Sequence, residues 1–463
     1  MCARNILRSD AWNVLCEQAK VVVVSDLVHD AEFRLEASGN GVTFYDYATF
    51  PISVRVALRA AIDAETFKWT RERDVVTLRI IEATIRAGMA DPILARFNDI
   101  FCARSSVLAR FRSVRAALLG FVRRAAARHQ HYARLLESER PDVVLLTHPY
   151  TWEERLLTPA LRSHRIQTVA AIHSWDNPTT HPVMLERYDR VLVWNDILKA
   201  QMIRLYDYSA EDILCTGMPQ LDSYVRGELN VDRGEFMRPL GLDPARRLIT
   251  YACGAPEFVP GQDRIVTHLA RVVAEDRLIA PASLVVRLHP GREAGELHAI
   301  GELPHVRIDR PSVAYSANYA RAGWHQDRSD ERHFVNLLRH SDVFINAFST
   351  TTIEAAAADV PIVNVAFDGD GPRPYHASLR KHYDWEHYAH IVRSGGVRLA
   401  RSYDDLTAAV QECLQDPALL REGRKRITRE QCGPLDGHAG LRIAQAVLSR
   451  IVANRSAVTE EDA

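Results

Sequence analysis

This chain has no excess of positive or negative charge. Its 58 Lys and Arg residues are balanced by 59 Asp and Glu residues, so the formal net charge is −1. Without an overall positive field, the chain has no general electrostatic attraction for nucleic acid. Long apolar runs are also missing. No stretch approaches the roughly eighteen apolar residues of a membrane-spanning helix, and the opening MCARNILRSDAWNVL has no apolar signal-peptide segment.

Cysteine is sparse and unpatterned. The seven cysteines are odd in number, widely spaced and never arranged as Cys-x-x-Cys. Such spacing supports neither a disulfide framework nor a zinc site. We therefore expect reduced cysteines in a cytoplasmic protein with no metal site and no cofactor.

The length and the alternation of segments predict the fold class. With 463 residues, the chain is too long for one ordinary core. Apolar segments alternate with helical stretches in both halves, which predicts α/β domains with parallel, doubly wound sheets. The candidate strands lie at 20–26, 142–148, 167–173 and 189–195 in the first half, and at 247–253, 283–290, 304–309, 342–347 and 361–367 in the second.

A polar stretch, 226–243, contains three glycines and a proline and predicts the domain boundary. We expect an N-terminal Rossmann-like acceptor domain over 1–225 and a C-terminal Rossmann-like donor-nucleotide domain over 244–434. Residues 435–463 are expected to form a helix that packs back toward the first domain, and then a polar tail. The helical pattern from Asn5 to Ala19 stands where an opening strand is expected. Two explanations stay open: the strand is absent from the first sheet, or the start of the sequence is truncated.

The run from Ser341 to Val365, SDVFINAFSTTTIEAAAADVPIVNV, combines a strand, a hydroxyl-rich turn, a short helix and a second strand. Hydroxyls beside the free N–H groups of a helix start are typical of a phosphate site. The alternative is an ordinary capping box, in which Thr351 caps the helix and Glu354 closes the box. This segment alone does not separate the two readings.

A second segment, SLVVRLHP at 283–290, is an apolar strand that ends in Arg287 and His289. A His after a strand is more often structural than functional. In a parallel sheet, however, ligands bind at the carboxyl ends of the strands, where both segments deliver polar side chains.

RLHP followed by SDVFINAFSTTTIEAA resembles the donor half of two-domain (GT-B) glycosyltransferases of bacterial surface polysaccharide synthesis. The similar branch includes sialyl- and polysialyltransferases, capsular Kdo transferases and the CDP-glycerol glycerophosphotransferases of teichoic acid. The resemblance implies two Rossmann-like domains that face a cleft. It also implies that His289 binds the donor phosphate, that Ser349, Thr350 and Thr351 cradle it, and that Glu354 holds ribose hydroxyls. From its place at the same strand end, we expect Arg287 to assist His289.

The turn HSWDNPTTHP, His173 to Pro182, follows the candidate strand at 167–173. A sugar hydroxyl that acts as nucleophile needs a base within hydrogen-bond reach, and Asp176 or His173 can supply it. We expect Asp176 to be the catalytic base, with His173 second. The alternative is a purely structural Asp-Asn-Pro turn.

Two further features have weaker functional interpretations. The stretch from Arg104 to Leu136 carries many arginines and no acidic residue, with apolar positions Val107, Phe111, Val114, Leu118, Phe121 and Ala125 expected to face the core. A solvated basic face is the ordinary explanation, and contact with an anionic membrane surface or glycan is the alternative. His376, His382, His387 and His390 lack the spacing of a metal site.

The sequence therefore predicts a cytoplasmic, metal-independent glycosyltransferase that moves a sugar from a nucleotide-sugar donor to a surface-polysaccharide or lipid-linked acceptor. Peripheral contact with the inner membrane surface is a further expectation. Two alternatives remain: a CDP-glycerol or CDP-ribitol type phosphotransferase, and a nucleotide-sugar epimerase of the same fold. The choice among CMP-, UDP- and CDP-linked donors stays open, as does retention or inversion of configuration.

Overall fold

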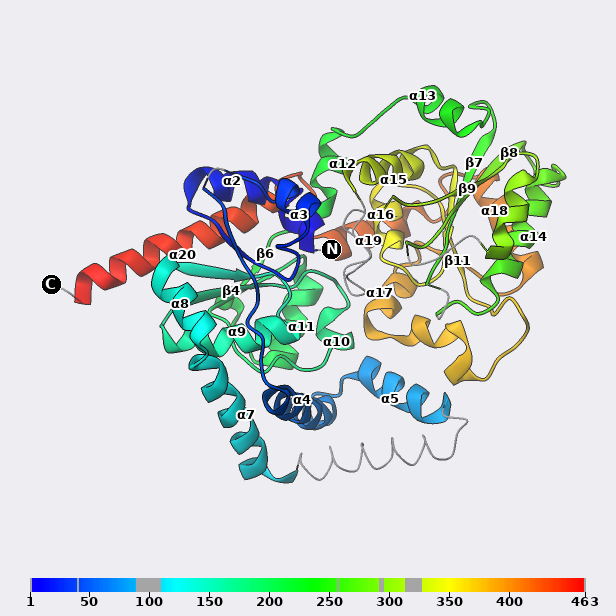
Figure 1. Cartoon of the computed structure of the whole chain (residues 1–463). Helices are drawn as coiled ribbons and strands as arrows, with labels where there is room; N and C mark the ends of the chain where they lie inside the picture. The colour runs from blue at the N-terminus through cyan, green and yellow to red at the C-terminus, as the bar shows by residue number, and fades with distance from the viewer. Residues whose placement is uncertain are drawn as a thin grey trace. The chain divides into compact units, whose positions relative to one another are not determined.

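The computed structural model describes residues 2–39, 41–88, 110–255, 258–290, 295–312 and 327–461. The chain divides into two compact units (Figure 1). Unit 1 contains residues 1–222 and 433–463, and unit 2 contains residues 223–432. Within the described ranges no helix is both long and apolar enough to cross a membrane.

Unit 1 is built on a parallel sheet with strand order β3-β4-β5-β6. Its strands are β3 (Val143–Leu146), β4 (Gln167–Ala171), β5 (Arg190–Val193) and β6 (Ile213–Cys215). Figure 1 shows α9 (Trp152–Ser163) and α11 (Asp196–Tyr206) on one side of this sheet and α20 (Ala439–Glu461) on the other. Helices on both faces explain why β4 and β5 are nearly continuous buried apolar runs.

The start of unit 1 departs from the expected sheet. The predicted strand at 20–26 forms only as β1 (Val22–Val24), and β1 pairs with β2 (Thr43–Tyr45) in a separate two-stranded sheet. Three-residue strands form few hydrogen bonds with each other. A side-chain contact adds to them: Tyr45 of β2 donates to Glu139 of α8 (Gln130–Glu139) over 2.5 Å. The segment before β1 is helical, as expected, and forms α1 (Cys2–Ile6) and α2 (Asp10–Gln18).

The remaining helices of unit 1 lie mainly between β2 and β3 and around the later strands. They are α3 (Ala31–Glu36), α4 (Ile52–Glu72), α5 (Val76–Gly88), α7 (Arg112–Ala127), α10 (Asn177–Thr180), η1 (Ala210–Asp212), η2 (Pro219–Leu221) and, at the boundary, Asp222 of α12 (Asp222–Arg226). Arg104 and the rest of the expected basic stretch before Arg110 lie outside the described residues.

Unit 2 has one six-stranded parallel sheet of order β12-β11-β10-β7-β8-β9. The strands are β7 (Arg247–Ala252), β8 (Ala282–Arg287), β9 (Val306–Asp309), β10 (Val343–Asn346), β11 (Ile362–Val365) and β12 (Arg398–Ala400). Figure 1 shows α14 (Gln262–Ala274) and α18 (Tyr403–Gln415) on one side of the sheet, with α15 (Arg328–His340) and α16 (Thr351–Ala357) on the other. This is the doubly wound arrangement that the alternating segments predicted.

The other elements of unit 2 are short helices at its start, a 3₁₀ helix between β8 and β9, and the helices that follow β11 and β12. They are α13 (Arg233–Met237), η3 (Arg238–Leu240), η4 (Gly295–Glu302), η5 (Tyr375–Ala377), η6 (Leu379–Asp384), α17 (Glu386–Ser394) and α19 (Arg421–Cys432). Side-chain caps fix several helix starts, as where Ser402 accepts the N–H of Asp405 at α18.

Two sets of hydrogen bonds explain where the units divide. The Asp222 carboxylate accepts the N–H groups of Ala439 and Gly440, at 3.0 and 2.8 Å, and so holds the start of α20 in unit 1. The stretch 226–243, which the sequence suggested as a linker, belongs to unit 2. There Asn336 on α15 accepts the N–H of Val231 and donates to the carbonyl of Leu229.

Candidate functional site

In unit 2 the two expected donor motifs leave the same edge of one sheet. His289 follows β8 and Ser349 follows β10, and both strands neighbour β7 in a parallel sheet. Neighbouring strands are about 4.8 Å apart, so the two exits are separated by about 10 Å across β7. The strand order reverses between β7 and β10, and in open α/β sheets ligands bind at that switch point.

The hydroxyl turn has a definite local structure. Helix α16 begins at Thr351 and not after it, so Thr351 is not the cap that the alternative capping box required. The Ser349 hydroxyl accepts both the N–H and the hydroxyl of Thr351, at 3.3 and 3.0 Å. Ser349, Thr350 and Thr351 are all half-buried, which leaves part of each side chain at the surface of unit 2.

Beneath this turn lies a buried polar network that the sequence did not predict. The hydroxyls of Thr352 and Tyr388 are 2.9 Å apart, and the Tyr388 hydroxyl donates to the side-chain amide oxygen of Asn364 over 2.9 Å. The side-chain amides of Asn346 and Asn364 meet at 2.5 Å, and Asn346 also contacts the Thr351 hydroxyl at 2.8 Å. The network links β10, β11, α16 and α17 and fixes the direction in which the turn leaves the sheet.

Glu354 lies inside α16, only 3% exposed. Its carboxylate accepts the phenolic O–H of Tyr224 over 2.7 Å. This contact ties α16 to α12 within unit 2. The contact of Glu354 with a ribose, implied by the resemblance, remains a proposal.

Arg287 has a different environment from the one expected. Its guanidinium is buried and donates to Asp309 over 2.8 Å and to Asp330 over 2.6 Å. The partly buried Asp309 and the buried Asp330 therefore neutralise it and join β8, β9 and α15. These two ion pairs favour a structural role for Arg287 over the expected phosphate contact, which remains a prediction. His289, two residues later, is half-buried beyond the end of β8 and remains the phosphate-binding candidate of this motif.

An aromatic group borders the hydroxyl turn. The rings of Phe348 and His382 stack with centroids 3.8 Å apart, and Trp385 lies 4.5 Å from His382. Burial lowers the pKa of His382 to about 4, so its imidazole is neutral near pH 7. The motif HYDW at 382–385 was visible in the sequence, but nothing in its spacing connected it with FSTTTIE. Among the described residues no group of His, Cys, Asp or Glu has the geometry to hold a metal ion.

In unit 1 a cluster of three histidines lies at the carboxyl ends of adjacent strands. His148 follows β3 and His173 follows β4, and their rings pack edge to face with centroids 4.0 Å apart. His181, just after α10, lies 5.5 Å from His148 and stacks on Tyr150. Burial lowers the pKa of all three imidazoles, for His148 to about 3. All three are therefore in the neutral, proton-accepting form near pH 7.

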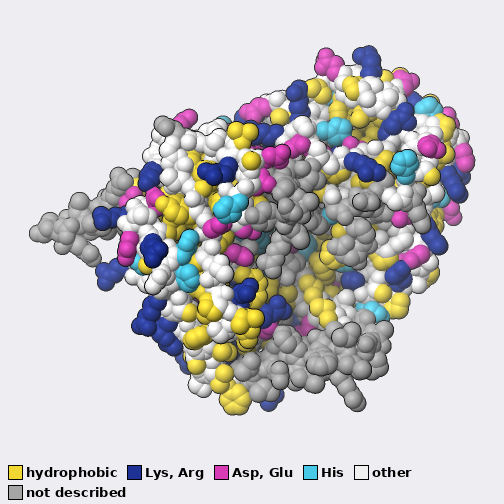
Figure 2. Space-filling model, viewed as in Figure 1, with side chains coloured by type: hydrophobic (Ala, Val, Ile, Leu, Met, Phe, Trp, Pro, Cys, Tyr) yellow, Lys and Arg dark blue, Asp and Glu magenta, His cyan; other side chains and the backbone are white. Residues whose placement is uncertain are grey.

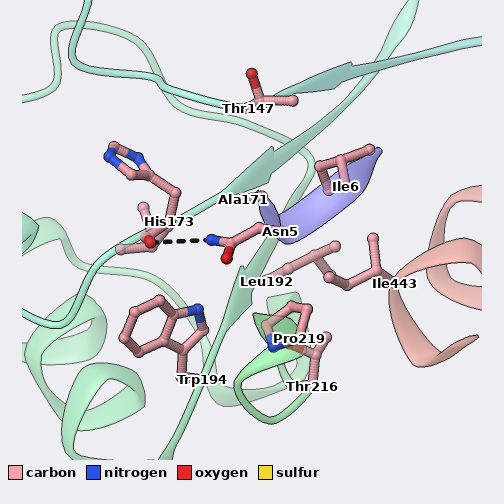
Figure 3. Close-up of a pocket in the computed structure, with 11 residues that line it drawn as sticks. Asn5, Ile6, Thr147, Ala171, His173, Leu192, Trp194, Thr216, Pro219 and Ile443 are labelled. Carbon is pink, nitrogen blue, oxygen red and sulfur yellow. Dashed lines mark hydrogen bonds between the residues drawn. The ribbon is translucent and has the colours of Figure 1, made fainter. Parts of the chain in front are cut away.

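His173 is held through its backbone. Asn5 of α1 donates a hydrogen bond from its side-chain amide to the His173 carbonyl over 3.1 Å (Figure 3). The imidazole itself is 9% exposed, and its Nδ1 has no hydrogen-bond partner among the described residues. The small cavity between Asn5, Thr216 and the end of β4 has a volume of about 10 Å³, room for roughly one water molecule.

The Asp176 carboxylate is already engaged within its own turn. One oxygen accepts the Ser174 hydroxyl over 2.5 Å and the other accepts the Thr180 hydroxyl over 2.9 Å. These bonds support the ordinary reading, in which the Asp-Asn-Pro segment is a structural turn. The turn presents Asp176 close enough to His148 and His181 for its charge to favour their protonated forms.

Glu154, near the carboxyl ends of β3 and β4, is a residue that the sequence analysis did not single out. Its buried carboxylate accepts the backbone N–H groups of Thr147 and His148, at 3.1 and 3.0 Å, and thereby fixes the turn that carries His148. Burial raises the pKa of Glu154 to about 7. A Glu in the first turn of α9 looks like any helix-start acid in the sequence, so no pattern distinguished it.

The basic stretch in α7 differs from expectation. Its helical spacing is present, but Phe111, Val114 and Phe121, expected to face the core, are exposed. Arg115, expected on the solvated face, is buried and donates to Glu65 on α4. The helix is therefore rotated relative to the face that the hydrophobic pattern suggested.

Comparison with models of known families identifies a family for this chain. The model of the family described as CDP-glycerol:poly(glycerophosphate) glycerophosphotransferase matches residues 174–449, more than half of the chain. A curated relative, the hydrolyzing UDP-N,N'-diacetylbacillosamine 2-epimerase of Legionella pneumophila, is 27% identical over 241 residues. That match covers 50% of this chain, and this chain spans 58% of the length of that relative.

Solved structures with a similar fold are more distant in sequence. The UDP-GlcNAc 2-epimerase of Neisseria meningitidis bound to UDP-GlcNAc is 12% identical, with a TM-score of 0.46 over 93% of this chain and 99% of that one. A glycosyltransferase from Rickettsia africae is 14% identical, with a TM-score of 0.40 over 71% and 82%. The assignment rests on the family match: the chain belongs to the CDP-glycerol:poly(glycerophosphate) glycerophosphotransferase family.

Proposed function

We propose that this protein transfers a polyol phosphate, of the glycerol- or ribitol-phosphate class, from a CDP-linked donor to a hydroxyl of a surface-polysaccharide or lipid-linked acceptor. One observation carries the proposal. The family match over 174–449 includes Asp176 in unit 1 and all the donor-site candidates of unit 2. Polyol-phosphate transfer was the first alternative to glycosyl transfer in the sequence, and the family now favours it.

The reaction needs two kinds of protein group. An acceptor hydroxyl oxygen attacks the β-phosphorus of the donor, a new O–P bond forms, and the bond from that phosphorus to the bridging oxygen breaks. The hydroxyl proton passes to a base, and CMP leaves with the bond's electron pair as an added negative charge. A base on the acceptor side and donors of hydrogen bonds to phosphate on the nucleotide side supply this chemistry.

For the base we place His173 ahead of Asp176, which reverses the order expected from the sequence. The His173 imidazole is neutral and has an uncommitted ring nitrogen, whereas both carboxylate oxygens of Asp176 already accept hydroxyl hydrogen bonds. Hydroxyl hydrogen bonds stabilise the charged form of a carboxylate and so make Asp176 a weaker proton acceptor. Burial also lowers the proton affinity of the His173 imidazole, so its place ahead of Asp176 rests on the open ring nitrogen. Asp176 then holds the turn in which the base is placed.

For the leaving CMP we propose His289 together with Ser349, Thr350 and Thr351, without a metal ion. These side chains follow β8 and β10 beside the switch point of the unit 2 sheet. Glu354 is proposed to accept ribose hydroxyls through its carboxylate, the group that now accepts the Tyr224 phenol. Arg287 contributes by holding β8, β9 and α15 together, not by binding phosphate.

Glycosyl transfer from a nucleotide sugar is the second candidate, favoured by the joint occurrence of RLHP and FSTTTIE. In that reaction the acceptor oxygen attacks the anomeric carbon and a nucleoside diphosphate leaves. Epimerisation of a nucleotide sugar is the third, and the Legionella relative favours it. The sialyl- and Kdo-transferase branch of the resemblance is a narrower form of the second candidate.

Thermal stabilisation by nucleotides separates the donors. A ligand that binds only the folded state raises the melting temperature according to its affinity. We expect CMP and CDP to stabilise the protein more than UDP, GDP and dTDP do, and we expect Ser349→Ala and His289→Ala to reduce the effect. Selective stabilisation by UDP would refute the CDP-linked donor and favour the second or third candidate.

A further inference from the structure

One buried arginine of unit 1 has no carboxylate partner. Arg155, near the start of α9, is 3% exposed and forms no ion pair with any described residue. The other buried arginines of the described ranges each pair with Asp or Glu: Arg115 with Glu65, Arg287 with Asp309 and Asp330, and Arg424 with Asp359. A buried cation without a counter-ion is costly. Arg155 therefore marks a place where a bound anion stabilises the folded protein.

Cations at the surface lack this property. Figure 2 shows Lys and Arg side chains spread over the visible face, with Asp and Glu side chains among them. Water and nearby acids offset such exposed charges, so each one attracts an anion only weakly. Burial gives the charge of Arg155 a stronger effect on its surroundings, because the effective dielectric constant there is lower.

The guanidinium of Arg155 lies between two loops at the carboxyl-end edge of the unit 1 sheet. Its Nε donates to the Tyr150 carbonyl and its Nη2 donates to the Pro182 carbonyl, each over 3.1 Å. Tyr150 follows β3, and Pro182 follows β4 and α10. The third nitrogen, Nη1, is buried and has no hydrogen-bond partner among the described residues. The guanidinium is therefore held in place with donor capacity that the protein leaves unused.

The same two loops carry two histidines of the cluster described above. The His181 ring stacks on Tyr150 with centroids 5.0 Å apart and lies 5.5 Å from the ring of His148. Burial lowers the pKa of both imidazoles, and the nearby Arg155 charge lowers it further. Within the described chain no hydrogen bond engages the ring nitrogens of either residue. Two neutral imidazoles, each with one N–H to donate, thus lie near the unpaired cation.

This group of side chains can be reached by a ligand. His148 and His181 are both half-buried, so part of each ring is open to solvent. Asp176 is the acidic residue nearby, but its two carboxylate oxygens accept the hydroxyls of Ser174 and Thr180, and it forms no ion pair with Arg155. The positive charge of Arg155 therefore stays unpaired at this edge of the sheet.

We propose that Arg155, His148 and His181 form an anion site in unit 1 that binds a phosphate group of the acceptor. The imidazole N–H groups donate to phosphate oxygens, and the guanidinium supplies the counter-charge. This inference rests on the proposed function, in which His173 beside His148 is the base. A three-carbon polyol end places its free hydroxyl a few ångströms from its phosphate, so one acceptor end can reach both groups. The site thus favours an acceptor with a phosphate next to the reacting hydroxyl over a neutral sugar.

Titration calorimetry of the purified full-length protein with glycerol 3-phosphate tests the site without turnover. We expect glycerol 3-phosphate to bind and uncharged glycerol not to bind. Arg155→Gln should weaken binding by about 10-fold to 100-fold, the usual effect of losing a charged hydrogen-bond partner. Because Arg155→Gln also changes two bonds to backbone carbonyls, His181→Phe provides a second variant. It keeps a ring on Tyr150 but has no N–H, and it should also weaken binding.

A matched control is available in the same unit. Arg115→Gln removes another buried arginine charge, but Arg115 already pairs with Glu65 over 2.7 Å. We expect this variant to lower the melting temperature and to bind glycerol 3-phosphate as the wild type does. An equal loss of binding in Arg115→Gln would reduce the effect to net charge or to general destabilisation and would overturn the proposal.

The phosphate candidates of unit 2 are a competing location for the same probe. Binding to the Arg155 site should persist in His289→Ala and in the presence of saturating CMP. Binding that is lost under both conditions and kept in Arg155→Gln would assign the phosphate to unit 2 and overturn the inference. Wild-type protein that does not bind glycerol 3-phosphate, or that binds glycerol equally well, overturns it directly.

The outcome for the site is separate from the outcome for the reaction. Binding that depends on Arg155, in a protein that leaves CDP-linked polyols intact, would support the anion site and refute the proposed transfer. Where transfer occurs, His181→Phe should raise the KM for a glycerol-phosphate oligomer by about tenfold or more and leave the KM for donor unchanged. A fall in kcat with both KM values unchanged would show a structural role and contradict the proposal.

Discussion

The His173 imidazole packs edge to face against His148 with ring centroids 4.0 Å apart, and burial holds the pKa of both rings below the ordinary value for histidine. The unfolded chain binds protons at these residues below pH 6.5 and the folded chain does not. Stability should therefore fall as pH falls from about 6.5 toward the folded pKa values, which for His148 is about 3.

Replacing one ring isolates this effect. Between pH 7.5 and 5.5, His148→Phe should lose about 1.4 kcal/mol less stability than the wild type, the contribution of one histidine that stays neutral. Urea unfolding at the two pH values measures the difference. An equal loss in both proteins would mean that His148 titrates normally in the folded state.

The Glu154 carboxylate gives the opposite pH dependence. Its folded pKa is raised to about 7, so its stabilising contribution is present at low pH and is lost as pH rises from about 4.5 through 7. Glu154→Gln should therefore gain stability relative to the wild type between pH 5 and 8, by more than about 1 kcal/mol. Glu154→Ala leaves the N–H groups of Thr147 and His148 without their acceptor and should destabilise the protein by about 1–3 kcal/mol at pH 5. The difference should shrink toward pH 8, where the wild type has lost the contribution of the protonated carboxyl.

The order of the two candidate bases is tested by kinetics with the donor that the nucleotide panel selects. His173→Ala should lower kcat by about 100-fold to 10,000-fold, the usual contribution of a general base, with an unchanged KM for donor. Asp176→Asn retains a hydrogen-bond acceptor in the turn and should cost less. A larger loss in Asp176→Asn than in His173→Ala would restore the order expected from the sequence.

The role of Arg287 is a question of stability. Arg287→Ala leaves the buried Asp330 and the partly buried Asp309 without their cation, which should destabilise unit 2 by about 3–5 kcal/mol. A phosphate-binding arginine would instead lose nucleotide affinity and keep its melting temperature. Denaturant unfolding and nucleotide titration of the same variant decide between the two.

Sequence reasoning located strands better than it located side-chain environments. The buried strands β7, β8, β10 and β11 were recognisable because a parallel sheet covered on both faces requires runs of apolar residues. The ion pairs of Arg287 could not be predicted from the sequence, because its partners Asp309 and Asp330 lie 22 and 43 residues away in the chain. Periodicity also gave the helix of α7 but the wrong face, since Arg115 pairs with Glu65 and Arg123 pairs with the buried Glu186, both on other elements.

In the candidate sites, too, the positions of strand ends were predicted and the side-chain contacts were not. His289 and the hydroxyls of FSTTTIE could be placed at one sheet edge because parallel strands end together. Glu154 could not be found, because it acts through hydrogen bonds to a turn whose geometry forms only in the folded state. Asn364 could not be found either, because its partner Tyr388 lies on another element, α17. His148 was missed for a similar reason: only the pairing of β3 with β4 brings it to His173.

The buried network under the hydroxyl turn makes a further prediction. Tyr388→Phe removes the hydroxyl that bridges Thr352 and Asn364 and should destabilise the protein by about 1–3 kcal/mol. Because this network holds the turn, the variant should also bind the stabilising nucleotide less tightly. A stable variant with full nucleotide affinity would show that the turn is set by other contacts.

The most direct test of the proposed reaction is the identity of the nucleotide released by the purified protein. Incubation with CDP-glycerol or CDP-ribitol, with and without a glycerol-phosphate oligomer as acceptor, should release CMP, faster with acceptor, and the release should be lost in His173→Ala and His289→Ala. The account is contradicted if CDP-linked polyols stay intact while a nucleotide sugar yields a nucleoside diphosphate or its 2-epimer.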